Sequence, residues 1–297
     1  MIIVVSGASG LIGTPMKAAL RAAGHELRVL VRHEPTSSEE FEWDPAAGRL
    51  DGNVLVGAGA VINLSGAPVA GHRWNDSYKR TIVDSRVQPG RTLAEAIAAR
   101  GDSAPPAYLV ASAVGYYGDT GDAVVTEDTP SGRGFLADVC RRWEAAAAPA
   151  ADSGHTRVVH LRTGLVLAPH GGALGPLRLT AKAGIAGRLG SGRQYQPWIS
   201  LADEIAALLF LLSADVSGPV NLTGPEPVRQ ADLARELAHA LHRPSVVPTP
   251  AFAVRLALGE FADEGVLIGQ RAVPAVLSRA GYRFTHPTLS EALQAVA

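Results

Sequence analysis

The sequence has only one cysteine, Cys140, among its 297 residues, which rules out a disulfide bond within the chain. Such chains are typical of reducing compartments, so we expect a cytoplasmic protein. Long apolar runs are also missing, since AALLFLL at 206–212 is far shorter than the roughly 20 residues that cross a bilayer. No positive residues precede the short apolar start, MIIVV, so we expect a first strand there and not a signal peptide.

An excess of charge of either sign is missing too. The 27 basic and 28 acidic residues give a net charge of −1, and no basic run is longer than a pair. This argues against nucleic acid or a membrane as the main partner and favours a small molecule, which the sequence does not identify. We expect no metal site, because His239 and His242 lie three apart on a predicted helix without a second pair of ligands. A homodimer is compatible with this composition, but the sequence does not specify the oligomeric state.

Apolar runs alternate with Ala-, Leu- and Arg-rich runs through the first 167 residues. The strand-like runs lie at 2–6, 27–31, 54–66, 108–114 and 157–167, and the helical runs lie at 11–23, 78–100 and 135–150. Alternation of this kind predicts parallel strands joined by crossover helices. Because the strands are apolar on both faces, we expect an α/β fold with a doubly wound parallel sheet that is covered on both sides.

The pattern changes after residue 167. Residues 170–198 are Gly-rich and irregular, and a helix follows, with Ser200 as its cap and Asp203 and Glu204 in its first turn. One more strand, 220–224, and a helix, 232–243, come next. We therefore expect a nucleotide domain over 1–167, which the strand at 220–224 joins, and a smaller C-terminal lobe over 168–297.

A glycine-rich loop follows the first strand. The segment GASGLIG has Gly7, Gly10 and Gly13 at three-residue spacing, and it opens the first helix. Glycine permits the tight turn and the close approach of a pyrophosphate, which the helix N-terminus then binds, so the loop predicts a Rossmann dinucleotide site. A plain strand–turn–helix unit is the alternative. The expected cofactor-binding residues of the loop are Gly7, Ser9, Gly10, Leu11, Ile12 and Gly13.

The end of the second strand indicates which dinucleotide binds. An acidic residue there would bind the ribose 2′-OH of NAD, but the strand LRVLV ends in Arg32. Since Arg suits a 2′-phosphate, we expect NADP(H), although Arg32 stacked on adenine or lying in solvent is the alternative. The segment INLSG at 62–66 should also border the cofactor, through Leu64, Ser65 and Gly66, because ligands bind at the carboxyl ends of such strands.

Several motifs together resemble a known family. GASGLIG, INLSG and SAVGYYG resemble the extended and atypical short-chain dehydrogenase/reductases. The fuller set, which includes INLSGAPVAGHRW, LRTGLVLAPHGGAL, QPWISLADEIAAL and AVPAVLSRAGYRFTHPTLSEAL, resembles the YfcH-like or SDR39U1-like group of epimerase-family proteins. That resemblance covers essentially the whole chain. It implies an extended-type Rossmann protein that binds NADP, ending in a family-specific segment of unknown function at about 246–294.

The resemblance also implies a catalytic pair that this chain lacks. The wider superfamily uses a Tyr as general acid/base and, four residues later, a Lys that lowers the phenol pKa and binds the nicotinamide ribose. Counting back from Glu144 in FLADVCRRWE puts Leu136 at the Tyr position and Cys140 at the Lys position, and no Tyr-x-x-x-Lys occurs anywhere. Leu136 cannot move a proton, and we interpret Cys140 and Trp143 as packing residues.

Other residues remain as candidates at the carboxyl edge of the sheet. Ser112 in SAVGYYGD matches the superfamily serine by type, although counting back from YGD places Ala113 there. By the same match Tyr117 would face the cleft and Tyr116 would pack against the sheet. We take Ser112 and Tyr117 as the catalytic candidates.

Two more candidates lie further along the chain. Arg162 ends an apolar strand and needs either a carboxylate or an anionic substrate group as its partner. Trp198 follows the Gly-rich stretch and is expected either in a loop that closes over substrate or in a packing role.

These features leave two functions open. The first is an NADP(H)-dependent oxidoreductase or epimerase acting on a small polar molecule, with the proton coming from Ser112, Tyr117 or water. The second is a catalytically silent protein that binds NADP(H) as a sensor or scaffold, which the missing Tyr–Lys pair favours.

Overall fold

A central eight-stranded sheet organises the protein, for which a computed structural model describes residues 1–297 except 173, 183–186, 245–246 and 297. Its strand order is β12-β8-β6-β5-β1-β2-β3-β4. All neighbouring pairs are parallel except β3 with β4, which confirms the doubly wound parallel sheet. The strands are β1 (Ile2–Ser6), β2 (Glu26–Val31), β3 (Glu40–Asp44), β4 (Arg49–Leu50), β5 (Ala58–Asn63), β6 (Ala107–Ala113), β8 (Arg157–Thr163) and β12 (Gly218–Leu222).

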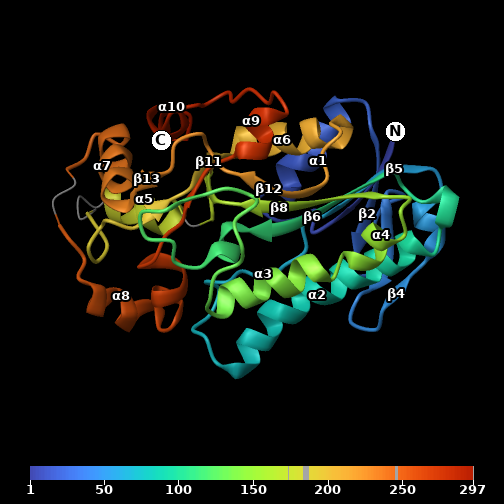
Figure 1. The fold of residues 1–297 in the computed structure, drawn as a ribbon, viewed down its shortest axis with the longest axis horizontal. Coiled ribbons are helices and arrows are strands. Elements are labelled where there is room, and N and C mark those ends of the chain that lie inside the picture. Colours follow the sequence, from blue (N-terminus) through green and yellow to red (C-terminus); the bar gives the residue numbers. More distant parts are fainter. Residues whose placement is uncertain (173, 183–186, 245–246, 297) are drawn as a thin grey trace.

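Helices cover both faces of this sheet (Figure 1). One face carries α1 (Gly13–Ala22), α6 (Leu201–Ser213) and α9 (Ala275–Arg279), and the other carries α2 (Asp76–Ala98), α3 (Phe135–Ala145) and α4 (Ala148–Asp152). Strand β1 shows why both layers form: Ile3 and Val5 pack with α1 and α6, whereas Val4 packs with α2 and α3. Successive side chains point to opposite faces of a strand, so an all-apolar strand needs a helix layer on each side.

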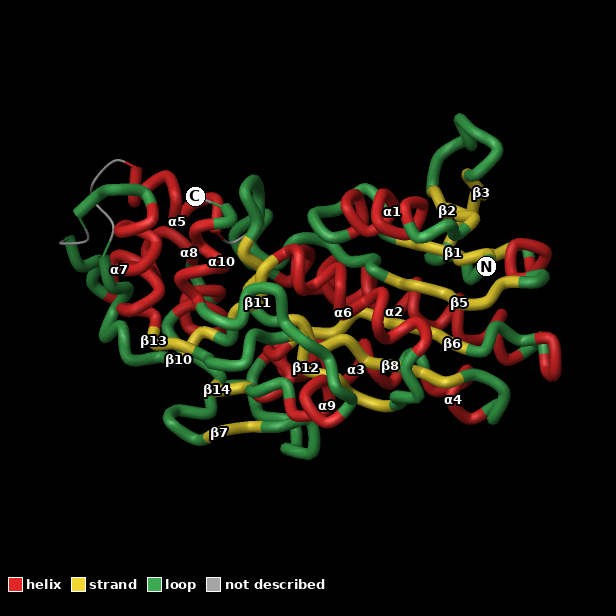
Figure 2. Tube along the Cα trace, turned by 90° about the horizontal axis from the view of Figure 1, so that it is seen from above, coloured by secondary structure: helices red, strands yellow, loops and turns green. Residues whose placement is uncertain are grey.

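A smaller lobe lies beyond the carboxyl ends of the strands (Figures 1 and 2). It contains α5 (Leu174–Lys182), α7 (Gln230–Ala240), α8 (Ala251–Leu258), α10 (Leu289–Gln294) and the two-stranded pair β10 (Tyr195–Gln196) with β13 (Val228–Arg229). Two other short pairs link distant segments: β9 (Leu165–Leu167) with β11 (Trp198–Ser200), and β7 (Val124–Val125) with β14 (Arg271–Ala272). The lobe has its own apolar cluster, which includes Leu174, Leu233 and Leu293.

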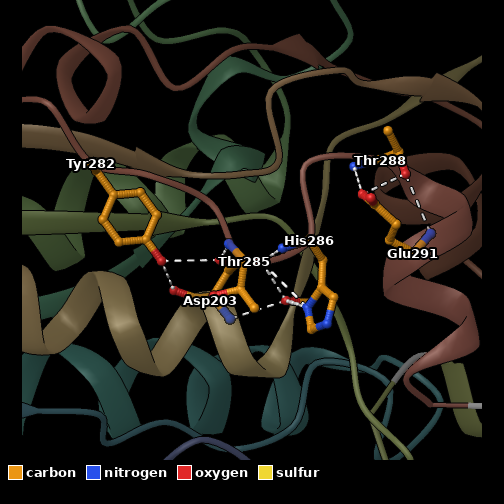
Figure 3. A network of polar contacts seen from close by, with 7 residues as sticks. Asp203, Tyr282, Thr285, His286, Thr288 and Glu291 are labelled. Atoms are coloured by element: carbon orange, nitrogen blue, oxygen red, sulfur yellow. Dashed lines mark hydrogen bonds and ion pairs between the residues drawn. The ribbon is translucent and has the colours of Figure 1, made fainter.

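The C-terminal segment is tied to α6 through a buried carboxylate, Asp203 (Figure 3). Its two oxygens accept hydrogen bonds from the Tyr282 hydroxyl and from the backbone N–H groups of Thr285 and His286. Ser200 caps α6 as expected, because its side chain accepts a bond from the Asp203 N–H.

Several elements differ from the sequence-based expectation. The helix expected over 135–150 is two helices, α3 and α4, and the strand expected over 157–167 is interrupted between β8 and β9. The hairpin β3–β4 was not expected, because Phe41 and Trp43 alternate with acids and residues 40–50 carry no continuous apolar run. The late strand, β12, lies at the sheet edge beside β8. None of the described helices has the length and apolar character that a membrane crossing needs.

Candidate functional site

The glycine loop has two positions, Gly7 and Gly13, where a side chain would not fit. Gly7 has a φ of +71°, and a Cβ there would lie 2.4 Å from the carbonyl carbon of Leu64. A Cβ on Gly13 would lie 2.3 Å from the Gly7 carbonyl oxygen. Distances this short are steric clashes, so the two glycines are required for the tight turn and for the contact of the helix with the strand.

The N-terminus of α1 is open beyond this turn. The helix has no side-chain cap and no acidic residue in its first turn. Ser9 and Gly10 are exposed, and Leu11 and Ile12 are half-buried. Uncapped N–H groups together with the helix dipole form an anion-binding site, and here no carboxylate of the first turn competes for it.

The loop after β5 is fixed against the glycine loop by a small polar network. The Asn63 side-chain oxygen accepts bonds from the Ser6 hydroxyl at 2.8 Å and from the Ser65 N–H at 3.0 Å. The Leu64 N–H donates to the Ser6 carbonyl oxygen at 3.0 Å. These bonds place Leu64, Ser65 and Gly66 next to Gly7, at the carboxyl edge of neighbouring parallel strands.

Arg32 lies at the same edge, directly after β2. Its side chain is exposed, and it makes no hydrogen bond or ion pair with the described residues. Because Ser6 of β1 is paired with Leu30 of β2, the chain reaches Arg32 just beside the glycine loop. A free guanidinium at this place suits a phosphate on the adenosine ribose.

Ser112 and Arg162 meet at one partly buried carboxylate, that of Glu144. The Ser112 hydroxyl donates to Glu144 Oε1 at 2.7 Å, and Arg162 donates from Nε at 2.8 Å and from Nη2 at 2.9 Å. Ser112 and Arg162 are only 4% and 3% exposed. Of the two partners expected for Arg162, the structure therefore has the carboxylate. Burial by itself lowers the arginine pKa, but the bidentate ion pair with Glu144 outweighs it, so the pKa is raised.

The two tyrosines are the reverse of the expected arrangement. Tyr117 is 2% exposed, and its hydroxyl donates to Asn221 Oδ1 at 2.7 Å and accepts from Arg162 Nη1 at 3.0 Å. Tyr116 is partly exposed and lies over the Arg162 guanidinium, 3.5 Å from it. Burial raises the pKa of Tyr117 to about 12, although Arg162 opposes this shift. The expectation that Tyr117 faces the cleft is thus wrong, and its pKa is moved away from the range a general acid/base needs.

The helix α3 carries no proton-transfer group at the positions of the missing pair. Leu136 and Cys140 both face Gly115. A Cβ on Gly115 would lie 3.6 Å from Leu136 Cβ and 3.8 Å from Cys140 Sγ. Cys140 is buried and donates weakly to the Ala113 carbonyl oxygen at 3.6 Å. Burial raises the thiol pKa to about 12, so Cys140 is not a thiolate near neutrality.

Trp198 is not in a loop. It begins β11, is 1% exposed, and donates from its indole N–H to the Glu226 carbonyl oxygen at 2.9 Å. Its ring packs with Leu233 and Leu237 of α7. The expectation of a segment that closes over substrate is therefore corrected, and the side chain joins the lobe to the rest of the protein.

Glu204 is a buried acid whose environment the sequence does not reveal. It is 1% exposed, and its Oε1 accepts a bond from the Thr163 hydroxyl at 3.0 Å. No described residue bonds to its other oxygen. Burial raises the pKa of Glu204 to about 8, so the carboxyl group is protonated at neutral pH. The sequence pattern placed it only in the first turn of α6, where acids are common on exposed helices.

This burial predicts a pH dependence of folding. The carboxyl group stays protonated in the folded state up to a pH of about 8, but in the unfolded chain it loses the proton near the ordinary glutamate pKa of 4.5. Stability must therefore fall as pH rises between these values, by about 1.4 kcal/mol per pH unit. The free energy of unfolding, measured with urea between pH 5.5 and 7.5, should fall less steeply with pH in Glu204→Gln than in the wild type, by this amount per pH unit. The same change at exposed Glu42 should leave the slope unaltered, and an equal slope in both variants would contradict the prediction.

No group of three or more His, Cys, Asp or Glu side chains that could hold a metal ion occurs within the described part of the chain.

Together the doubly wound sheet and the glycine loop define a dinucleotide-binding protein of the Rossmann class. The family model "NAD dependent epimerase/dehydratase family" matches residues 3–223, and the "Domain of unknown function (DUF1731)" matches residues 249–296. The chain belongs to this epimerase/dehydratase family, and within it to the SDR39U1-like group that ends in DUF1731. This confirms the resemblance inferred from the motifs.

Individual relatives match nearly the whole of this chain. Epimerase family protein Mb2239 of Mycobacterium bovis is 48% identical over 98% of this chain and 96% of its own. The crystal structure of human epimerase family protein SDR39U1 with NADPH has a TM-score of 0.90 and 31% identity, and covers 100% of this chain and 99% of its own. A nucleoside-diphosphate sugar epimerase from Corynebacterium glutamicum has a TM-score of 0.80 and 33% identity, over 99% of this chain and 58% of its own.

Proposed function

We propose that the protein binds NADP(H) and acts as an oxidoreductase or epimerase on a small polar substrate. One observation supports the choice of cofactor. The uncapped N-terminus of α1, which follows the tight turn at Gly7, lies beside the exposed Arg32, and this arginine has no acidic partner among the described residues. The human relative whose crystal structure contains NADPH, and the family name, support a nicotinamide dinucleotide at this position.

The residues that would hold the cofactor have distinct tasks. The N–H groups at the start of α1 bind the pyrophosphate, Arg32 binds the 2′-phosphate, and Leu64 to Gly66 line the side of the site toward β5. When bound, the nicotinamide supplies or accepts hydride. The chain positions it at the edge of the sheet, where Ser112 is held by Glu144 and keeps lone pairs on its hydroxyl oxygen that can still accept a hydrogen bond.

The preference for the 2′-phosphate is tested by Arg32→Asp. We expect NADPH to bind about 100-fold more weakly, because a charge-assisted bond is replaced by repulsion, while NADH affinity stays the same or improves. The measurement is titration of nicotinamide fluorescence for both cofactors. Arg49→Asp, which makes the same charge change on the outermost strand, should leave both affinities unchanged. An unaltered NADPH/NADH ratio in Arg32→Asp would show that the arginine does not bind the phosphate.

A second candidate function is binding of NADP(H) without turnover, as a sensor or scaffold. The observation that favours it is that the two catalytic candidates, Ser112 and Tyr117, are both buried. In addition, the pKa of Tyr117 lies further above neutral pH than that of a free phenol. A panel of aldehydes, ketones and sugar nucleotides separates the two functions. NADPH binding with neither cofactor oxidation nor an epimerised product across the panel supports the silent protein, and turnover of any member supports the enzyme.

A further inference from the structure

Arg86 on α2 is a buried cation without an acidic partner. It is 8% exposed, and among the described residues it bonds only through Nη1, to the Ile82 carbonyl oxygen at 2.9 Å and to the Ser85 hydroxyl at 3.4 Å. No carboxylate of the described residues lies within ion-pair distance of it. A buried charge of this kind costs free energy unless something else pairs with it, so an external acceptor for Nε and Nη2 is expected.

The surroundings of Arg86 place it at the cofactor site. A Cβ on Gly66, in the loop after β5, would lie 3.2 Å from the guanidinium carbon and 3.4 Å from Nη2. The absence of a side chain at Gly66 thus leaves space over the nitrogen that has no internal acceptor. On its other side the guanidinium lies 4.9 Å from the ring centre of Trp143, a contact that fixes its plane.

Arg86 also lies close to the helix that lacks the expected lysine. Its ring partner Trp143 belongs to α3 and lies three residues, about one helical turn, after Cys140, so the two side chains share a face of that helix. Burial lowers the pKa of Arg86. Even so, an arginine stays charged at neutral pH. A cation from α2 therefore reaches the space beside Cys140, the residue at the lysine position of α3.

We propose that Arg86 replaces the missing lysine as the cation that binds the nicotinamide-side ribose of the cofactor. This rests on the proposed function. A guanidinium that is stacked on Trp143 and bonded through Nη1 has a fixed direction, and its Nη2 and Nε can donate to the ribose hydroxyls. Unlike lysine it does not release a proton, so its task is to position the nicotinamide and not to relay protons.

The experiment compares two ligands. NADPH contains the nicotinamide riboside, whereas adenosine 2′,5′-bisphosphate contains the 2′-phosphate and lacks that riboside. In Arg86→Met we expect NADPH to bind about tenfold more weakly and adenosine 2′,5′-bisphosphate to bind within twofold of the wild type. Arg86→Lys should retain part of the lost NADPH affinity. Arg80→Met, at an exposed position on the same helix, is the matched control and should change neither affinity.

Each outcome is informative. Unchanged NADPH affinity in Arg86→Met would overturn the assignment of Arg86, and so would an equal loss for both ligands, which would indicate a role in folding or at the adenosine side. Retained binding of adenosine 2′,5′-bisphosphate also shows that the variant is folded. If the wild-type protein binds neither ligand, the proposed function fails, which is distinguishable from failure at Arg86 alone.

Discussion

Glu144→Ala should destabilise the protein by about 3–5 kcal/mol, because it leaves the Arg162 guanidinium buried without a counter-charge. The arginine side chain is 4% exposed and the glutamate side chain 12%, so water replaces little of what is lost. Ser112 loses its acceptor in the same variant. Urea unfolding followed by circular dichroism gives the free energy directly.

A control for this variant lies on the same helix. Asp138 is about half exposed and pairs with Arg141 at 2.9 Å. Asp138→Ala should cost about 1 kcal/mol or less, as exposed pairs do. The double variant Glu144→Leu/Arg162→Met should be more stable than either single variant, because neither charge is then left unpaired. Equal losses of unfolding free energy in Glu144→Ala and Asp138→Ala would show that the buried ion pair contributes no more to stability than the exposed one.

The nucleotide half of the candidate site is predictable from sequence, because the sequence features that indicate it lie close together in the chain. The glycine spacing, the strand before it and the helix after it all occur within residues 2–22, and the structure joins them as expected. Arg32 follows the next strand directly, so its place depends only on the pairing of β1 with β2. A prediction of this kind needs no knowledge of distant contacts.

The other half of the candidate site, where substrate is expected, is not predictable from sequence, because its side chains are placed by contacts with distant parts of the chain. Tyr116 and Tyr117 are adjacent in a short turn, and which of them points inward is decided by Asn221, 104 residues later in the chain. Trp198 follows a Gly-rich stretch that is typical of loops, but its pairing with Leu165 makes it a strand residue. Arg86 belongs to a helix whose sequence gives no sign that this one cation is buried.

The helix FLADVCRRWE is best understood as a structural support whose contacts cross the two parts of the chain. Glu264, from the C-terminal DUF1731 segment, accepts a bond from the Leu136 N–H at 3.1 Å, which supplies the cap that Gly134 lacks. At the other end Glu144 holds Ser112 and Arg162. The helix thus keeps the position of a catalytic element while its side chains organise packing, which agrees with a cofactor cation that comes from α2.

Asp203→Ala should cost a similar amount, about 3–5 kcal/mol, and should loosen the C-terminal segment first. The carboxylate is fully buried and accepts bonds from the Ser200 and Tyr282 hydroxyls and from the N–H groups of Thr285 and His286, at 2.6–3.1 Å (Figure 3). Each buried donor left without an acceptor costs about 1–3 kcal/mol. Among the described residues, 282–286 would keep only two hydrogen bonds to this end of α6: the Tyr282 hydroxyl to the Asp203 carbonyl oxygen at 3.1 Å, and the bond between His286 Nδ1 and the Ser200 hydroxyl at 3.0 Å.

Hydrogen exchange measures this loosening at single residues. The amides of Thr285 and His286 should exchange faster in Asp203→Ala than in the wild type, before the amides of the central sheet are affected. Asp232→Ala removes an exposed acid from the first turn of α7, in the same place along its helix, and should leave exchange at 285 and 286 unchanged. Uniform acceleration across the whole chain in Asp203→Ala would instead mean that the C-terminal segment and the sheet unfold as one unit, and that the carboxylate stabilises both alike.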